Sequence, residues 1–267
     1  MQKSQIKEKL KSAIQIYKKT KDPRVSEVIE HLTKILSTSK SRNSLLDYAK
    51  HVYPGYKDPA HIKLIAKNLE SLEKGEINRL AVFMPPRHGK SMLCSEFFPA
   101  WYLGNNPKEF VIQSTYAQEL ADDFGRKVRN QIASPDFNSV FPQVGLRADS
   151  SSAKRFHTMQ GGTYSAVGAG GAITGRGAHL LIIDDPIKGR EDAESETQRR
   201  NLVEWYKSVA YTRLQPGGKI IIIQTRWHQD DLAGHILAES KEDWKVLDLP
   251  AIDDKGNALW PEAYSKK

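Results

Sequence analysis

The segment Met84–Ser91 (MPPRHGKS) constrains the fold of this chain more than any other. It follows the apolar run Leu80–Phe83 and precedes a helix-compatible run. A strand, a tight turn ending in Gly-Lys-Ser and a helix together direct backbone N–H groups and a helix N-terminus at bound phosphates. In such a turn Lys90 reaches the β- and γ-phosphates of a nucleotide, and the Ser91 hydroxyl ligates Mg²⁺. The usual pattern begins with glycine, whereas methionine occupies that position here.

A second motif is the apolar run His179–Asp185, which ends in two carboxylates. Such a run predicts a strand buried on both faces of a parallel sheet. Ligands of open α/β sheets bind at the carboxyl ends of the strands. We expect Asp184 to hold Mg²⁺ and Asp185 to orient the attacking water. The alternative is a buried strand that simply ends in a polar turn.

A third apolar run, Ile220–Gln224, also ends in polar residues. In P-loop motors such a strand lies beside the magnesium-site strand, and its tip senses the γ-phosphate. Gln224 and Thr225 are our candidates for coupling hydrolysis to the rest of the protein. The alternative is a core strand with a polar exit.

The apolar runs alternate with helical patterns from residue 77 onward, which predicts an α/β fold with a mostly parallel central sheet flanked by helices. A glycine-rich, hairpin-like stretch spans residues 151–174. The predicted strands are Leu80–Phe83, Phe110–Thr115, Leu180–Asp184, Ile220–Gln224 and Trp244–Leu249. The predicted helices are Ser91–Tyr102, Gln118–Ala133, Ala193–Ser208 and Leu232–Ser240.

Charge and periodicity divide the chain into a basic helical segment, residues 1–43, and a main domain, residues 44–267. Residues 1–50 hold 12 Lys and Arg against 5 Asp and Glu, which accounts for nearly all of the net charge of +8. Such a segment suits nucleic acid or another acidic partner, or it is a solvated helix face. The chain lacks a membrane-length apolar run and a secretory signal. Its single cysteine, Cys94, fits a reducing cytosol.

Several segments together resemble the large terminase subunit of tailed double-stranded DNA bacteriophages. Terminase phosphate loops commonly lack the first glycine and carry an arginine in the turn, as Met84 and Arg87 do here. The resemblance covers about residues 45–262. The segments that carry it are Gly75–Leu80, Met84–Ser91, Ile173–Gly177, Leu181–Pro186, Gln224–His228 and Asp230–Gly234.

The resemblance implies a P-loop NTPase of the ASCE/RecA-like type with ATP and Mg²⁺ as cofactors. Its activity is that of a motor that couples ATP hydrolysis to translocation of double-stranded DNA into the procapsid. The implied partners are DNA, the portal protein, the small terminase subunit and further copies of the chain, typically in a ring of five. An isolated domain is expected to be monomeric. The implied location is the cytoplasm of the infected bacterial host, transiently on the procapsid, and not the finished virion.

The resemblance also assigns roles to individual residues. Arg87 contacts phosphate within its own subunit, and Arg176 acts in trans as an arginine finger, although the two roles can be exchanged. Asp184-Asp185 stands where many relatives have Asp-Glu, so Glu191 or Glu194 is an alternative catalytic acid. The other expected contacts with ATP are Pro86, His88, Gly89 and Met92 in the loop, and Tyr56 and His61 on the adenine side.

Other functions are weighed against this one. A helicase-like nucleic-acid ATPase shares the core chemistry, whereas a non-hydrolysing nucleotide-binding scaffold needs no water-orienting acid; a small-molecule kinase is a weaker option. No nuclease activity is expected, because the chain ends before the clustered acids of the nuclease domain that follows in full-length relatives. His228, Asp230, Asp231 and His235 suggest a metal site, but an Asp230 or Asp231 cap on the following helix is the preferred interpretation.

Overall fold

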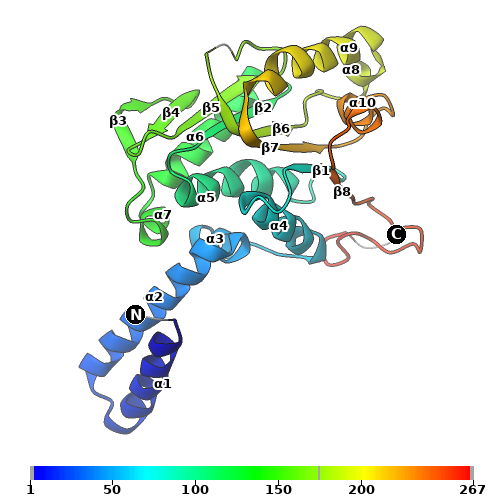
Figure 1. Cartoon of the computed structure of the whole chain (residues 1–267). Coiled ribbons are helices and arrows are strands. Elements are labelled where there is room, and N and C mark those ends of the chain that lie inside the picture. The colour runs from blue at the N-terminus through cyan, green and yellow to red at the C-terminus, as the bar shows by residue number, and fades with distance from the viewer. Residues whose placement is uncertain (1–2, 174, 265–267) are drawn as a thin grey trace.

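The structure, a computed structural model, describes residues 3–173 and 175–264. Within them eight strands form one sheet in the order β3-β4-β5-β2-β6-β7-β1-β8, and helices cover both of its faces (Figure 1). All five predicted strands are present. The strands are β1 (Arg79–Phe83), β2 (Phe110–Thr115), β3 (Leu146–Ser151), β4 (Arg155–Thr158), β5 (Thr163–Gly168), β6 (Ala178–Asp184), β7 (Leu214–Gln224) and β8 (Lys245–Asp248).

The sheet is parallel from β5 to β8 and antiparallel at its other edge. β2 pairs in parallel with β5 and β6, and β1 pairs in parallel with β7 and β8. β4 runs antiparallel to both β3 and β5. The expectation of a mostly parallel sheet is therefore met only in part, because the hairpin-like stretch adds antiparallel strands to one edge.

β7 lies between β1 and β6 and pairs with both in parallel. The expectation that the third apolar run forms a strand beside the carboxylate-bearing strand is thus confirmed. Because parallel strands end at the same edge, the segments that follow β1, β6 and β7 emerge side by side. This topology places the turn after Phe83, the carboxylates after Ile183 and Thr225 at one edge of the sheet.

Side chains alternate along the strands and build two cores. In β1, Leu80 and Val82 face one core while Ala81 and Phe83 face the other. The helices before β6 cover the first face, and those after β6 cover the second. They are α3 (Leu45–Val52), α4 (Ala60–Glu73), η1 (Met92–Phe97), α5 (Phe98–Asn105), α6 (Gln118–Ile132) and α7 (Pro135–Val140), then α8 (Arg190–Glu194), α9 (Glu196–Trp205), η2 (Tyr206–Ala210), η3 (Tyr211–Arg213) and α10 (Leu232–Glu239).

The N-terminal helices α1 (Lys3–Thr20) and α2 (Pro23–Asn43) form a hairpin that projects from the rest of the molecule (Figure 1). Arg42 donates to the carbonyl of Val140 at 2.6 Å, and Trp101 Nε1 donates to the carbonyl of Ser41 at 3.0 Å. The division into residues 1–43 and 44–267 stays a prediction. None of the helices formed by the described residues combines the length and hydrophobicity needed to span a bilayer.

The helix predicted over Ser91–Tyr102 contains a π-helical turn, η1, before α5 begins at Phe98. Pro99 has no N–H and its ring crowds the carbonyl four residues earlier, so the regular hydrogen bond to Ser95 cannot form. The Phe98 N–H donates to the carbonyl of Leu93, five residues earlier, rather than to the carbonyl four residues earlier as in a regular α-helix. The turn is wider as a result, and the Ser95 carbonyl accepts from the Gln113 side chain at 3.2 Å.

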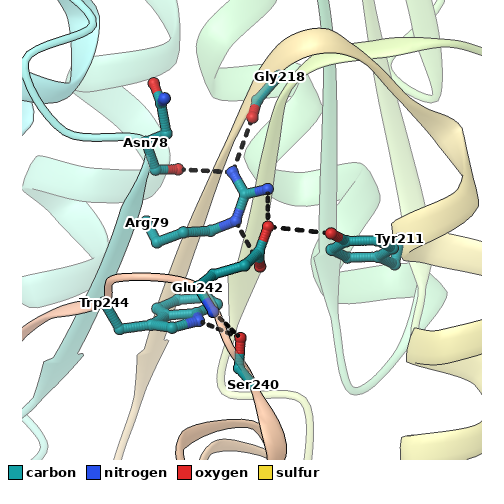
Figure 2. A network of polar contacts seen from close by, with 7 residues as sticks. All are labelled: Asn78, Arg79, Tyr211, Gly218, Ser240, Glu242 and Trp244. Atoms are coloured by element: carbon teal, nitrogen blue, oxygen red, sulfur yellow. Dashed lines mark hydrogen bonds and ion pairs between the residues drawn. The ribbon is translucent and has the colours of Figure 1, made fainter.

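At the amino-terminal end of β1, the Arg79 guanidinium joins several segments of the chain (Figure 2). Arg79 forms an ion pair with Glu242 and donates at 2.8 Å to the Gly218 carbonyl. Tyr211 donates its hydroxyl to the same Glu242 carboxylate at 2.9 Å. The segment leading into β8 is thereby fastened to β1, whose other end carries the Gly-Lys-Ser turn.

Candidate nucleotide-binding site

The turn Met84–Ser91 leaves β1 and enters the helix through two residues with left-handed backbone. Arg87 has φ 63° and Gly89 has φ 88°. At Gly89 an added Cβ would lie 3.2 Å from the Ile62 side chain, so the turn approaches α4 closely. A non-glycine residue in this conformation is uncommon and indicates a backbone shape imposed by its surroundings. The turn therefore has the tight shape that the Gly-Lys-Ser pattern predicts.

Two buried histidines stabilise this turn: His61, which lies in α4, and His88, which lies in the turn itself. His61 Nε2 lies 3.0 Å from the carbonyl oxygen of His88, and His88 Nδ1 lies 2.9 Å from that of Pro86. Since a carbonyl only accepts, both nitrogens are the donors. Burial lowers the pKa of His61, which favours the neutral ring. The adenine contacts expected of His61 and Tyr56 stay predictions; the Tyr56 ring packs edge-on against Phe97 at 5.1 Å.

The C-terminal segment also contacts the turn, which the sequence did not reveal. Tyr264 donates its hydroxyl to the Arg87 carbonyl at 3.0 Å and stacks on the His88 ring with centroids 4.6 Å apart. Trp260 lies 5.6 Å from the ring of His61. We call Trp260 and Tyr264 the aromatic clasp. The available signal was two aromatic residues in a short polar segment, which by itself indicates no partner.

Lys90, Asp185 and Thr225 meet at the edge where β1, β6 and β7 end. The Lys90 ammonium lies 2.8 Å from Asp185 Oδ2 and donates to Thr225 Oγ1 at 2.7 Å. The Thr225 N–H donates to Asp185 Oδ1 at 2.7 Å. Lys90 is buried, at 4% exposed, so its charge is held by these oxygens and not by water. The sequence-predicted phosphate lysine, catalytic acid and sensor threonine are therefore in direct contact.

Asp185 adopts a backbone conformation that aspartate rarely takes, with φ 42°. Its N–H donates to the Ile223 carbonyl at 2.8 Å, and its carbonyl accepts from Tyr116 at 3.2 Å. These two bonds continue the pairing of β6 with both neighbouring strands past its last residue. They hold the chain in a turn that presents the carboxylate to Lys90.

Asp184, by contrast, is fully enclosed at 1% exposed. Ser95 in η1 donates to its Oδ2 at 2.7 Å. Burial, with the neighbouring Asp185 carboxylate second, raises the pKa of Asp184 to about 6, while Ser95, Lys90 and Ser91 act in the opposite direction. Two adjacent carboxylates thus lie in different environments, one paired with Lys90 and one buried among hydroxyls.

The residues around Asp184 fit a bound Mg²⁺. Among the described residues its Oδ1 is buried without a hydrogen-bond partner, and the Ser91 hydroxyl interacts with the same carboxylate. Carboxylate and hydroxyl oxygens are the ligands that Mg²⁺ prefers. An unpartnered buried carboxylate oxygen is costly unless something binds it.

The remaining candidates lie at different distances from this centre. Gln224 is buried and its carbonyl accepts from Met84 at 3.4 Å, which joins the start of the turn to β7. Arg176 is half-buried near Arg155, and burial, followed by that second positive charge, lowers the pKa of Arg176. Within the described residues no hydrogen bond or ion pair joins the Arg176 side chain to Lys90 or the two aspartates. Glu191 and Glu194 lie exposed on α8.

The His228–His235 segment contains a helix cap. Asp231 accepts from the Gly234 N–H at 2.9 Å and from Arg226 Nε at 2.7 Å. The preferred interpretation from the sequence is confirmed for Asp231. In residues 3–173 and 175–264, no group of three or more His, Cys, Asp or Glu side chains is placed to hold a metal ion.

Comparison with known proteins identifies a family for this chain. No curated protein matches the chain. Residues 82–266 match the family described as terminase large subunit, T4likevirus-type, N-terminal. The matched segment includes the Gly-Lys-Ser turn, both aspartates and the tip of β7, and it covers more than half of the chain. The chain therefore belongs to the terminase large subunit family, in its N-terminal region.

Proposed function

We propose that this chain is a Mg²⁺-dependent ATPase motor that couples ATP hydrolysis to translocation of double-stranded DNA into a viral procapsid. The observation that carries the proposal is the contact of Lys90, Asp185 and Thr225 beside the buried Asp184. A cation that binds phosphate, a carboxylate that holds Mg²⁺ and a second carboxylate that orients water are the parts that P-loop hydrolysis requires.

The strand order supports assignment to the ASCE/RecA-like P-loop NTPases. The strand that precedes the phosphate turn, β1, and the strand that carries the carboxylates, β6, are separated by β7. In this proposal the sensor is the residue at the tip of β7, between the phosphate-binding lysine and the catalytic acid. Thr225 occupies that position and contacts both.

Each side chain has a defined task in this proposal. Lys90 and the backbone N–H groups from Pro86 to Met92 bind the phosphates, and Ser91 and Asp184 hold Mg²⁺. Bound there, Mg²⁺ would neutralise charge that develops on the γ-phosphate. Asp185 orients the attacking water and accepts its proton, while Arg87 and Arg176 stabilise the transition state.

Family membership supports the packaging role and its partners. We infer that the chain acts on double-stranded DNA with the portal protein, the small terminase subunit and further copies of itself in a ring. Because translocation proceeds over any sequence, its DNA contacts are electrostatic and sequence-independent. The place of action is then the cytoplasm of the infected bacterium.

The test is ATP turnover measured against protein concentration, with and without Mg²⁺ and double-stranded DNA. We expect Mg²⁺-dependent turnover that rises per subunit as copies assemble, and loss of at least about 100-fold in Lys90→Ala. Lys127→Ala is the control, since Lys127 forms an ion pair with Glu96 on the surface. Turnover in Lys90→Ala equal to that of the wild type would refute the assignment. Strand unwinding without portal dependence would favour the helicase alternative.

A further inference from the structure

A cluster of buried polar side chains lies beneath the helix that follows the phosphate turn. Ser95, Gln113 and Thr115 are each 0% exposed, and Asp184 is 1% exposed. Thr115 and Asp184 are neighbours in the parallel register of β2 and β6. Gln113 lies two residues before Thr115 and so shares its face of the sheet. The cluster is therefore shared by η1, β2 and β6 at the position of the Mg²⁺ carboxylate.

The π-helical turn places Ser95 in this cluster. Because Pro99 has no N–H, the Ser95 carbonyl lacks the donor that a regular α-helix would supply. Gln113 Nε2 donates to this carbonyl at 3.2 Å. Ser95 Oγ donates to Asp184 Oδ2 at 2.7 Å. Ser95 is thus held through its backbone by β2 and in turn holds the carboxylate of β6.

Three oxygens of the cluster have no hydrogen-bond partner among the described residues: Gln113 Oε1, Thr115 Oγ1 and Asp184 Oδ1. Leaving a buried polar atom unpaired is unfavourable, so such atoms are uncommon in folded proteins. Mg²⁺ in proteins usually retains several waters. Those waters carry O–H groups, which are the donors that unpaired oxygens lack.

We propose that Ser95, Gln113 and Thr115 form an outer polar layer of the Mg²⁺ site, in which Ser95 is a positioning residue for Asp184 and the free oxygens accept from metal-bound water. This inference rests on the proposed function. It assigns a role to residues that lie outside the turn Met84–Ser91 and outside the Asp184-Asp185 pair. Residues of this kind contact the metal ligands and not the metal itself. Their mutation typically changes metal affinity 10–100-fold.

The experiment uses the full chain, Mn²⁺ as the probe and a non-hydrolysable ATP analogue, with bound Mn²⁺ measured by electron paramagnetic resonance. We expect Ser95→Ala to weaken Mn²⁺ binding about 10-fold or more and to leave the affinity for the analogue without metal unchanged. Ser95→Thr, which keeps a hydroxyl, is expected to retain part of the Mn²⁺ affinity that Ser95→Ala loses. Thr115→Val, which keeps the side-chain shape, is expected to weaken Mn²⁺ binding in the same direction.

Ser114→Ala is the matched control. Ser114 is a buried serine of β2, the strand that carries Thr115, and its hydroxyl also lacks a partner among the described residues. Its side chain, however, faces the opposite core. If Ser95→Ala and Thr115→Val bind Mn²⁺ within twofold of the wild type, or Ser114→Ala weakens it equally, the outer layer is refuted and the ATPase proposal is untouched. If the wild type binds no Mn²⁺ in the presence of the analogue, both the outer layer and the ATPase proposal are refuted.

Discussion

Lys90 and Asp185 form an ion pair with an N–O distance of 2.8 Å across the tip of the strand that separates them. Thr225, at that tip, accepts from Lys90 and donates its N–H to Asp185. The lysine proposed to bind phosphate and the acid proposed to orient water therefore neutralise each other in this structure. In the proposed function a γ-phosphate would compete with Asp185 for Lys90, and a carboxylate released in this way would still accept from the Thr225 N–H. We therefore expect nucleotide binding and exposure of the Asp185 carboxylate to be linked through Lys90.

Asp185→Asn tests the water-orienting role. The amide oxygen still accepts from the Thr225 N–H, but it no longer competes with phosphate for the Lys90 charge, so we expect nucleotide affinity to be equal to or higher than that of the wild type. The side chain can no longer accept a proton, so turnover is expected to fall about 100-fold or more. Single-turnover hydrolysis and equilibrium nucleotide binding measure the two effects. Asp192→Asn on α8 is the control, and turnover that survives Asp185→Asn would place the catalytic acid elsewhere.

Asp184→Asn tests the cost of burying a carboxylate. The pKa of about 6 in the folded protein lies above the ordinary value of 3.8, so the buried charge destabilises the fold above pH 6. That penalty shrinks as pH falls from 6 toward 4, and it disappears below the ordinary pKa of 3.8, where the carboxyl is protonated in both states. Without Mg²⁺, we expect Asp184→Asn to raise Tm by roughly 5 °C at pH 7.5. The increase should shrink on titration to pH 4; a constant increase would contradict the burial argument.

Arg176→Ala tests for a finger supplied by a neighbouring subunit. Since Arg176 makes no hydrogen bond or ion pair with the Lys90 centre within the described residues, we expect its loss to lower turnover only where copies assemble. Adding the inactive Lys90→Ala chain, which retains Arg176, should then restore part of the activity. Mixing experiments at fixed total protein measure this. Arg147→Ala, which removes a surface ion pair with Asp149, is the control, and absence of rescue would argue for action within one subunit.

Tyr264→Phe tests the aromatic clasp. The phenyl ring keeps its stacking on His88 but no longer donates to the Arg87 carbonyl, at a cost of about 1 kcal/mol. We expect faster amide hydrogen exchange from Arg87 to Lys90 and little change in global Tm. Tyr53→Phe, at an exposed tyrosine whose ring packs near Phe97, serves as the comparison. Equal exchange in both variants would show that the clasp does not order the turn.

Five of the eight strands that the described residues form were predictable because burial on both faces favours apolar runs, whereas β3, β4 and β5 were not predicted as individual strands. Phe110–Thr115 was predicted with the bounds that β2 has. The helix predicted over Ala193–Ser208 is instead divided at Ser195, which caps α9 by accepting from Gln198. Both residues were visible in the sequence, as was Pro99 within the predicted Ser91–Tyr102 helix. In each case local capping and ring geometry prevailed over a longer helical periodicity.

The centre of the site was predictable for a different reason. Lys90, Asp184, Asp185 and Thr225 all follow apolar runs, and parallel strands bring such positions to one edge. The contributions of Ser95 and Tyr264 were not predictable, because they depend on a wide helical turn and on a chain reversal far away in sequence. Tertiary contacts of this kind leave no periodic signal.

The aromatic clasp also has a mechanical consequence. Tyr264 and Trp260 attach the C-terminal segment to the phosphate turn and to the histidine beneath it, rather than to a helix on the surface. Tension applied to the chain at Tyr264 is therefore delivered to Arg87 and His88. By the same linkage, a displacement of the turn at its nucleotide side pulls on the C-terminal segment. We therefore expect a displacement of the turn and a displacement of this segment to be coupled.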